Sequence, residues 1–176
     1  YVNGESTGQT TPYSAQYPPE TYKVSVRAYG YETPAERDVR IFNNPKSTHF
    51  ELVPASWDVD GFYAPVEMGD NVMNTVKAGQ AIPVKWHLSD ENGVAIADPA
   101  SFANLWSYTV TCPGSTVQEE PIYEVAPSPS DLQYNGDGNW QYNWKTDKAY
   151  KGQCRDAYVE FVNGITSPVA HFKFTR

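Results

Sequence analysis

The sequence is poor in sulfur and in charge, and it contains no long apolar run. It holds two methionines and two cysteines among 176 residues, and charged residues make up 19% of the chain. No apolar segment reaches the roughly 18–20 residues needed to span a bilayer, so we expect no membrane insertion. The net charge of -8 is opposite to the basic surface that nucleic-acid phosphates require, so we expect no nucleic-acid partner.

Motifs with a known catalytic or metal-binding mechanism are also missing. The sequence contains no Gly-x-Ser-x-Gly, no His-Glu-x-x-His and no Cys-x-x-Cys. Two of its three histidines, His87 and His171, have the outward parity of predicted strands, and His49 precedes another. Asp58 and Asp60 are a pair that could serve as acid and base, but carboxylates of this kind are more often solvated. We therefore predict that the chain is not an enzyme and needs no cofactor.

Proline, glycine and tyrosine are plentiful, with 14, 12 and 13 copies. Aromatic residues suit pleated strands, while Gly and Pro interrupt them, so this composition predicts short strands joined by turns. No segment shows a sustained helical period. We therefore predict an all-β chain of two tandem β-sandwich domains, immunoglobulin-like in outline. The domains cover residues 1–56 and 57–176, with the junction at Pro54-Ala55-Ser56.

The clearest alternation follows a turn at Ala78-Gly79. It predicts a strand whose buried face carries Ile82, Val84, Trp86 and Leu88. Alternation places Tyr22, Val24, Val26 and Ala28 inward in an earlier strand, and Trp106, Tyr108, Val110 and Cys112 together on one face of a later strand. Further strands are predicted at residues 38–41, 49–52, 140–144, 157–161 and 170–174, with a short strand near 122–125 inside a surface excursion over 113–139.

A series of short motifs runs through the first 54 residues. In order they are Tyr1-Val2-Asn3-Gly4, Gly8 with Thr11-Pro12, Pro-Pro-Glu-Thr-Tyr at 18–22, Val24-Ser25-Val26 and Gly30-Tyr31-Glu32. This layout resembles the PEGA family of small extracellular β-sandwich modules, although Glu20 stands where the family pattern usually has Gly. Tyr1 falls inside a strand of that pattern, so we expect an N-terminally truncated domain. The resemblance implies a fold and a surface location, and it supplies no catalytic residues.

Another ordered set of motifs spans residues 57–176. It comprises Gly61-Phe62 with Pro65-Val66, residues 74–79, Pro83-Val84-Lys85-Trp86, Tyr142 to Thr146, Gly152-Gln153-Cys154 and Ala170 to Phe174. These residues resemble the bacterial extracellular family named for its Pro-x-Lys-Phe motif, with Trp86 in place of Phe. The resemblance implies a module repeated in secreted and cell-surface proteins, including enzymes, and it leaves the module's own activity undefined.

The two cysteines, Cys112 and Cys154, are predicted to form a disulfide. Two cysteines in a cytosolic protein would more often be unrelated buried thiols, but the abundance of Tyr, Trp, Asn, Thr and Ser favours an oxidising compartment. The bond would close a loop of about 40 residues and stabilise the fold by about 4 kcal/mol on the chain-entropy model. We therefore expect an extracellular location, secreted or associated with the cell wall.

Two sets of residues are candidates for ligand contact. Exposed aromatic rings stack on sugars, and the rings for which exposure is predicted are Trp57, Tyr63, Tyr134, Tyr29 and Tyr31. Oxygen-bearing side chains at alternating positions resemble a calcium loop; they are Asn135, Asp137 and Asn139. The later acidic ligand of an EF-hand is missing, so a glycine-rich turn is the preferred interpretation and a metal is not required.

These observations predict a non-catalytic accessory or structural module of a larger bacterial secreted or cell-surface protein. Such a module would position neighbouring domains of the same polypeptide, or contact a polysaccharide or a surface protein. A carbohydrate-binding module of a secreted polysaccharide-degrading enzyme is one alternative. An appendage domain of a secreted protease is another.

Overall fold

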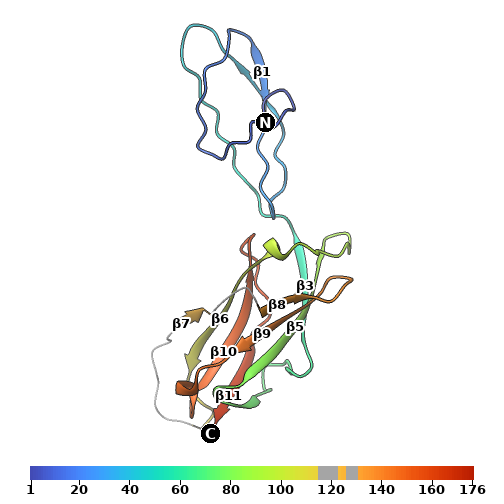
Figure 1. The fold of residues 1–176 in the computed structure, drawn as a ribbon, viewed down its shortest axis with the longest axis vertical. Helices are drawn as coiled ribbons and strands as arrows, with labels where there is room; N and C mark the ends of the chain where they lie inside the picture. Colours follow the sequence, from blue (N-terminus) through green and yellow to red (C-terminus); the bar gives the residue numbers. More distant parts are fainter. Residues whose placement is uncertain (115–122, 126–130) are drawn as a thin grey trace. The chain divides into compact units, whose positions relative to one another are not determined.

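Strands and turns make up nearly all the regular structure, which confirms the all-β prediction (Figure 1). The computed structural model describes residues 1–114, 123–125 and 131–176. Contacts divide the chain into two compact units, Tyr1–Ala55 and Ser56–Arg176. Among the described residues there is no helix with the length and apolarity that a membrane crossing demands.

The first unit contains a single two-stranded sheet, in which β1 (Thr21–Val24) pairs antiparallel with β2 (Arg37–Arg40). Residues 1–5 line the other side of β1, through a bridge between Val2 and Val24. All of residues 1–55 are described, and no second sheet occurs among them. A small sandwich of two sheets is expected for residues 1–56 from the sequence, but only one sheet is found in the first unit.

Two predictions for the first unit are wrong in detail. The strand expected at residues 49–52 is absent, because this segment is held by a side chain instead of a ladder. Arg37 donates a hydrogen bond to the carbonyl of His49 and lies 5.0 Å from the ring centre of Phe50. The predicted inward alternation is also interrupted at Ser25, which is buried, although Val26 and Ala28 are half-buried beside the exposed Arg27.

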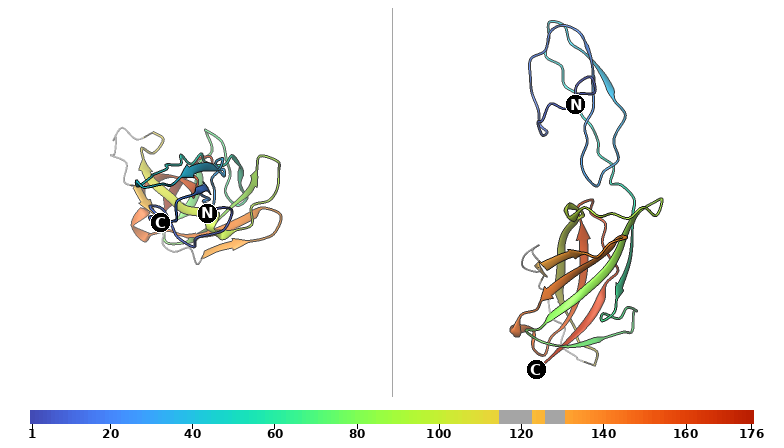
Figure 2. Two further views of the ribbon diagram at one scale, coloured as in Figure 1. Left: turned by 90° about the horizontal axis from the view of Figure 1, so that it is seen from above. Right: turned by 45° about the vertical axis from the view of Figure 1, so that its right-hand side comes forward.

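The second unit contains two sheets (Figures 1 and 2). One has the strand order β3-β5-β9-β8, and the other has the order β4-β11-β10-β6-β7. Strand β4 pairs with β11 in parallel, whereas the other neighbours are antiparallel. The strands are β3 (Trp57–Tyr63), β4 (Asn74–Lys77), β5 (Ala81–Asp90), β6 (Phe102–Val110), β7 (Tyr123–Val125), β8 (Leu132–Tyr134), β9 (Asn139–Lys145), β10 (Cys154–Phe161) and β11 (Ala170–Thr175). Short 3-10 helices occur at η1 (Pro99–Ser101) and η3 (Lys148–Tyr150).

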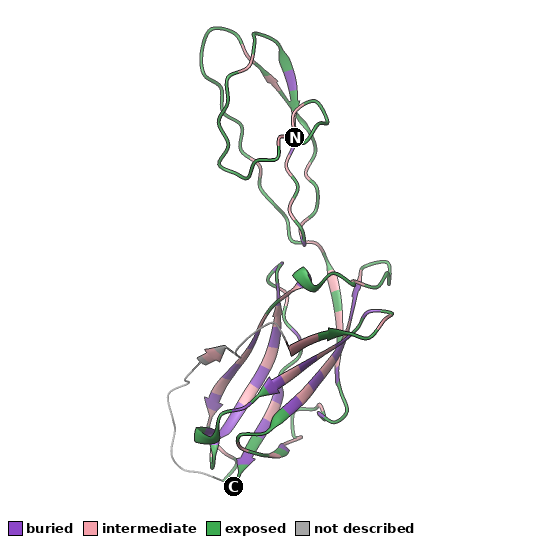
Figure 3. Ribbon diagram, in the orientation of Figure 1, coloured by how far each residue is buried: buried purple, intermediate pink, exposed green. Residues whose placement is uncertain are grey.

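Aromatic rings from both sheets meet in one core. Trp144 of β9 contacts Phe172 of β11 with 5.3 Å between ring centres, and Trp86 of β5 contacts Phe161 of β10 at 6.3 Å. Figure 3 shows buried residues alternating along these strands. The face-to-face packing is compatible with a β-sandwich. The buried face predicted for β5 is confirmed, since its four apolar residues are at most 5% exposed.

Strand β3 is adapted to β5 by a glycine. Pairing of the two strands shifts register between Asp60 and Tyr63. Gly61 lies in this bulge with a φ of +120°, and a Cβ there would be 3.2 Å from both the Lys85 carbonyl oxygen and the Trp86 Cα. Only glycine meets both the backbone angle and the close approach without strain.

The large aromatic residues of β6 suggest that their face of the strand meets the core. The opposite face of β6 does so instead. Leu105, Ser107 and Thr109 are buried, while Trp106 and Tyr108 lie half-buried on the outer surface of the sheet. The inner position of Ser107 is explained by its contact with a buried arginine, described below.

The predicted disulfide between Cys112 and Cys154 is confirmed. It joins Cys112, which follows β6, to Cys154, the first residue of β10. Strands β6 and β10 are neighbours in one sheet. The short strand predicted near residues 122–125 is found as β7, Tyr123–Val125. Of the excursion predicted over residues 113–139, positions 115–122 and 126–130 lie outside the described residues.

Candidate functional site

The five aromatic residues predicted to be exposed are divided between the two units, and those of the second unit do not form one group. Tyr63 and Tyr134 are both 40% exposed, but they lie on β3 and β8, the two opposite edges of the four-stranded sheet. Tyr29 is exposed and Tyr31 half-buried in the first unit. The exposure predicted for Trp57 is corrected: its ring packs against the core, because alternation in β3 turns it inward with Val59.

The loop that carries Asn135, Asp137 and Asn139 is closed by its own hydrogen bonds. Asn135 N–H donates to the Asn139 carbonyl at 2.8 Å, and the Asn139 side-chain amide donates to the carbonyls of Gly136 and Asp137. Asn139 therefore turns its donor, not its oxygen, toward the loop. In the described part of the chain, no group of three or more His, Cys, Asp or Glu residues is placed to hold a metal ion.

A different group of chemically active side chains lies on the outer surface of the five-stranded sheet. Strands β6, β10 and β11 place these side chains on one face, because residues of equal parity point to the same side of a strand. We call this group the outer aromatic face; it consists of Trp106, Tyr108, Asp156, Tyr158, Glu160 and His171.

Strand register explains how the outer aromatic face is assembled. Asp156 lies opposite Tyr108 on one side and opposite His171 on the other. Tyr158 lies opposite Trp106 in the next row. Side chains directly opposite one another on a sheet face are about 4.5–5.5 Å apart at Cβ, so these six residues are neighbours without any loop to position them.

Hydrogen bonds hold the polar groups of this face in place. His171 Nδ1 is 2.7 Å from Asp156 Oδ1, and the Tyr108 hydroxyl donates to Asp156 Oδ2 at 3.3 Å. Trp106 Nε1 donates to Glu160 Oε2 at 2.6 Å. The carboxylates of the face are therefore anchored from one side and keep lone pairs for a further donor.

The outer aromatic face combines ring surfaces with carboxylate acceptors. The rings of Tyr108 and Tyr158 meet edge-on with centres 6.4 Å apart. Aromatic rings beside fixed hydrogen-bond acceptors suit a ligand that presents both C–H surfaces and hydroxyl groups. A carboxylate that orients a histidine also occurs in hydrolases, but there a nucleophile lies at the second ring nitrogen. No hydroxyl or thiol among the described residues hydrogen-bonds to His171 Nε2.

On the inner side of the same sheet, a buried arginine makes a network that sequence reasoning missed. Arg155 is 1% exposed, and its guanidinium bonds to the side chain and carbonyl of Ser107 at 3.2–3.3 Å. It lies 4.1 Å from the ring centre of Tyr150 and 3.4 Å from Glu124 Oε2. A signal existed in the sequence, because Arg155 shares the inward parity of the apolar residues in β10.

Tyr150 completes this network by donating its hydroxyl hydrogen to Glu124. Burial first, and then the hydrogen bond to the Glu124 carboxylate, raise the pKa of Tyr150 to about 12. The positive charge of Arg155 opposes this shift. The network is therefore stable with a neutral phenol, and it ties β7 to β10 and η3.

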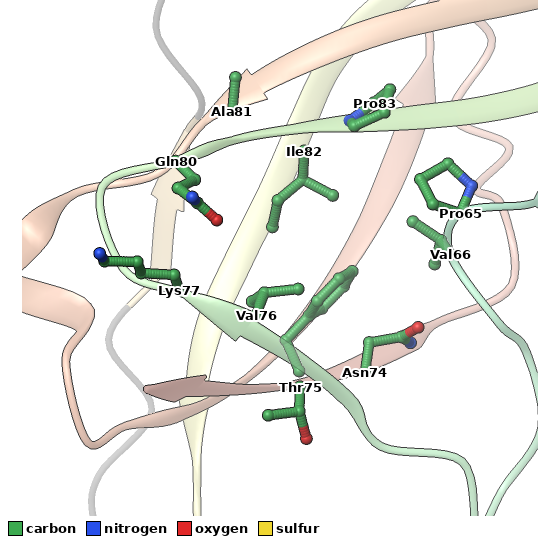
Figure 4. A pocket seen from close by; sticks show the side chains of 11 residues that line it. Pro65, Val66, Asn74, Thr75, Val76, Lys77, Gln80, Ala81, Ile82 and Pro83 are labelled. Atoms are coloured by element: carbon green, nitrogen blue, oxygen red, sulfur yellow. The ribbon is translucent and has the colours of Figure 1, made fainter. Parts of the chain in front are cut away.

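A cleft of about 270 Å³ lies where β4 and β5 diverge (Figure 4). Ile82 of β5 points toward Val76 of β4, and Phe172 forms part of the lining. The buried polar side chain at this site, Asn74, is already satisfied by Glu67 and by the His171 carbonyl. The cleft is thus a small gap lined by both polar and apolar residues, and its buried polar side chain is already paired.

Comparison of the chain with protein-family models, with curated proteins and with solved structures gave no match. The resemblances to the PEGA and Pro-x-Lys-Phe families therefore stay predictions from the residues quoted above. The function has to be argued from the fold and from the surfaces that it presents.

Proposed function

We propose that this chain is a non-catalytic, extracellular accessory module of a larger bacterial secreted or cell-surface protein. It would consist of a PEGA-like domain at residues 1–56 and an immunoglobulin-like domain of the Pro-x-Lys-Phe type at 57–176. Its task would be to position neighbouring domains of the same polypeptide or to contact a surface partner. The confirmed disulfide is consistent with an oxidising extracellular environment.

The observation that carries this proposal is the strand order of the second unit. The order β3-β5-β9-β8 corresponds to strands A, B, E and D of an immunoglobulin-like sandwich. The order β11-β10-β6-β7 corresponds to strands G, F, C and C′. Strand β4 continues strand A into this second sheet, where it pairs with strand G. Many cell-surface domains use this architecture as a structural or adhesive unit, which supports the accessory role.

Carbohydrate binding is the second candidate, and the outer aromatic face favours it. The ring of Trp106 would stack on a pyranose, and the anchored carboxylates of Asp156 and Glu160 would accept hydrogen bonds from sugar hydroxyls. This assignment replaces the dispersed aromatic residues suggested by the sequence with one contiguous surface. The ligand class would be a neutral polysaccharide, since the face already carries negative charge.

Binding of the intact chain to insoluble polysaccharides and to a glycan array tests both candidates. Retention that is lost in Trp106→Ala and kept in Tyr63→Ala would establish a carbohydrate-binding module and contradict a pure spacer. Tyr63→Ala is the matched control, because it removes an exposed ring outside the outer aromatic face. Absence of retention on every glycan supports the spacer role. Turnover of a substrate that disappears with a single carboxylate or histidine change would refute both candidates.

A further inference from the structure

Strand β2 of the first unit is paired on one side only, because its sheet holds two strands. A two-stranded sheet is marginally stable alone in water, and an exposed edge strand is a template for another strand. The far side of β1 is already occupied by residues 1–5. Within residues 1–55, all of which the structure describes, the open edge of this sheet is therefore that of β2.

The hydrogen bonds of Lys23 show which backbone groups face that edge. Its carbonyl accepts from Asn3 N–H at 2.7 Å, and its N–H donates to Asn3 Oδ1 at 2.9 Å, both on the side of β1 away from β2. The N–H and C=O of one strand residue point to the same side, and the side alternates along the strand. Tyr22 therefore directs its groups toward its register partner in β2, Val39.

The same alternation fixes the direction of the neighbouring groups in β2. Because Val39 faces β1, Asp38 and Arg40 turn their N–H and C=O groups to the open edge. The side chains of Asp38 and Arg40 share the solvent face of the sheet, and both residues are exposed. The edge thus presents two donor–acceptor pairs, flanked by one acidic and one basic side chain.

We propose that β2 pairs antiparallel with β2 of a second copy of this chain, about a two-fold axis through Val39. In this register, Asp38 lies opposite Arg40 of the second copy, and Arg40 lies opposite its Asp38. Both are hydrogen-bonded pairs, in which the two residues exchange two N–H···O=C bonds, so the two pairs together form four backbone hydrogen bonds. Opposite charges directly across a ladder are favourable, and the two-fold axis forms each pair twice.

The arrangement of charges selects this register. Charges on an edge strand usually prevent pairing. If the axis passed through Asp38, two aspartates would face each other; if it passed through Arg40, two arginines would. With the axis at Val39, every cross-strand charge pair formed by Asp38 and Arg40 is of opposite sign.

The contacts that Arg40, Arg37 and Lys23 make within the first unit are compatible with this pairing. The guanidinium of Arg40 rests over the ring of Phe42 at 4.4 Å, which restricts the arginine before pairing. Arg37 is bound on its own chain to the His49 carbonyl. The ion pair from Lys23 to Asp38 is solvated, with side chains 62% and 66% exposed, so it does not block the carboxylate. Two four-residue strands bury less than a standard interface, so the dimer is weak and depends on concentration.

Sedimentation velocity of the intact chain, from micromolar to millimolar concentration, measures this association. The wild-type mass is expected to rise from 19.7 kDa toward twice that value. Asp38→Arg and Arg40→Asp should each weaken the dimer by about tenfold or more, because every cross-strand charge pair becomes one of like sign. An equimolar mixture of the two variants should associate again, and so should the double variant D38R/R40D.

Asp70→Arg is the control, since it reverses an exposed charge outside the β1–β2 sheet and should leave association unchanged. Circular dichroism of each variant verifies that it is folded. A wild-type chain that stays monomeric at millimolar concentration would overturn the proposal and leave the edge to a strand of another protein. Association that persists in both single variants, or that the mixture fails to restore, would also overturn it.

Discussion

Replacing Tyr150 by phenylalanine is expected to remove part of the alkaline sensitivity of the fold. The pKa of Tyr150 is raised by burial and by its hydrogen bond to Glu124, from an ordinary value of 10.0 to about 12. Because the folded value lies above the unfolded one, the neutral phenol stabilises the fold fully below pH 10. This contribution is lost as the pH rises from 10 through 12, because the unfolded chain releases the proton first.

The magnitude follows from the size of the shift. A difference of two pKa units corresponds to about 2.7 kcal/mol once the pH exceeds both values. Between pH 9 and pH 11 the loss from this one group is about 1.3 kcal/mol, since the unfolded phenol is then about ten-elevenths ionised while the folded one is largely neutral. The residue is 8% exposed, so solvent screens the effect little.

Guanidinium chloride unfolding at several pH values between 9 and 11, followed by tryptophan fluorescence, measures this loss. Wild type and Tyr150→Phe differ in one hydroxyl group alone, so the difference between the two proteins isolates Tyr150. The stability advantage of wild type over the variant should shrink by about 1.3 kcal/mol across this range. A difference that stays constant with pH would refute the assignment of a raised pKa to Tyr150.

Three further predictions concern stability. Replacing both Cys112 and Cys154 by serine should lower the free energy of unfolding by about 4 kcal/mol, because it frees a long loop in the unfolded chain, and two titratable thiols in the denatured, non-reduced wild type would contradict the bond. Gly61→Ala should lower the free energy of unfolding, measured by chemical denaturation, by about 1–3 kcal/mol. Gly93→Ala should lower it less, because both glycines have positive φ but an added Cβ would meet backbone atoms at Gly61 and nothing at Gly93. Leu88→Ala, at a fully buried position, should cost about 2–5 kcal/mol, and a thermal melt unchanged from wild type would show that the site is not part of the core.

In the second unit, the strands in the middle of the sheets could be predicted from the sequence, whereas the edge strands β3, β4 and β8 could not. β5 and β10 have one face buried by the opposite sheet, so their apolar residues alternate strictly. β3, β4 and β8 lie at sheet edges, where one side of the ladder is open and burial is incomplete. β4 and β8 have only four and three residues, too few for a sustained alternation, and the alternation of β3 is interrupted at the Gly61 bulge.

The outer aromatic face was hidden for a related reason. Alternation groups Trp106 with Tyr108, but it does not tell which of two faces meets the core. The large rings suggest the inner face, whereas the buried guanidinium of Arg155 needs the small polar side chain of Ser107 on that side. Only the pairing of β6 with β10 decides between the two arrangements.

The parallel pairing of β4 with β11 has a mechanical consequence for the second unit. When tension is applied through the two ends of this unit, parallel strands at its beginning and end are pulled in opposite directions along their length. The ladder from Asn74 to Lys77 is then loaded in shear, so its register pairs resist together instead of opening one after another. The Cys112–Cys154 bond also withholds the residues between the two cysteines from extension. A unit built in this way transmits force along a polypeptide while changing its length little.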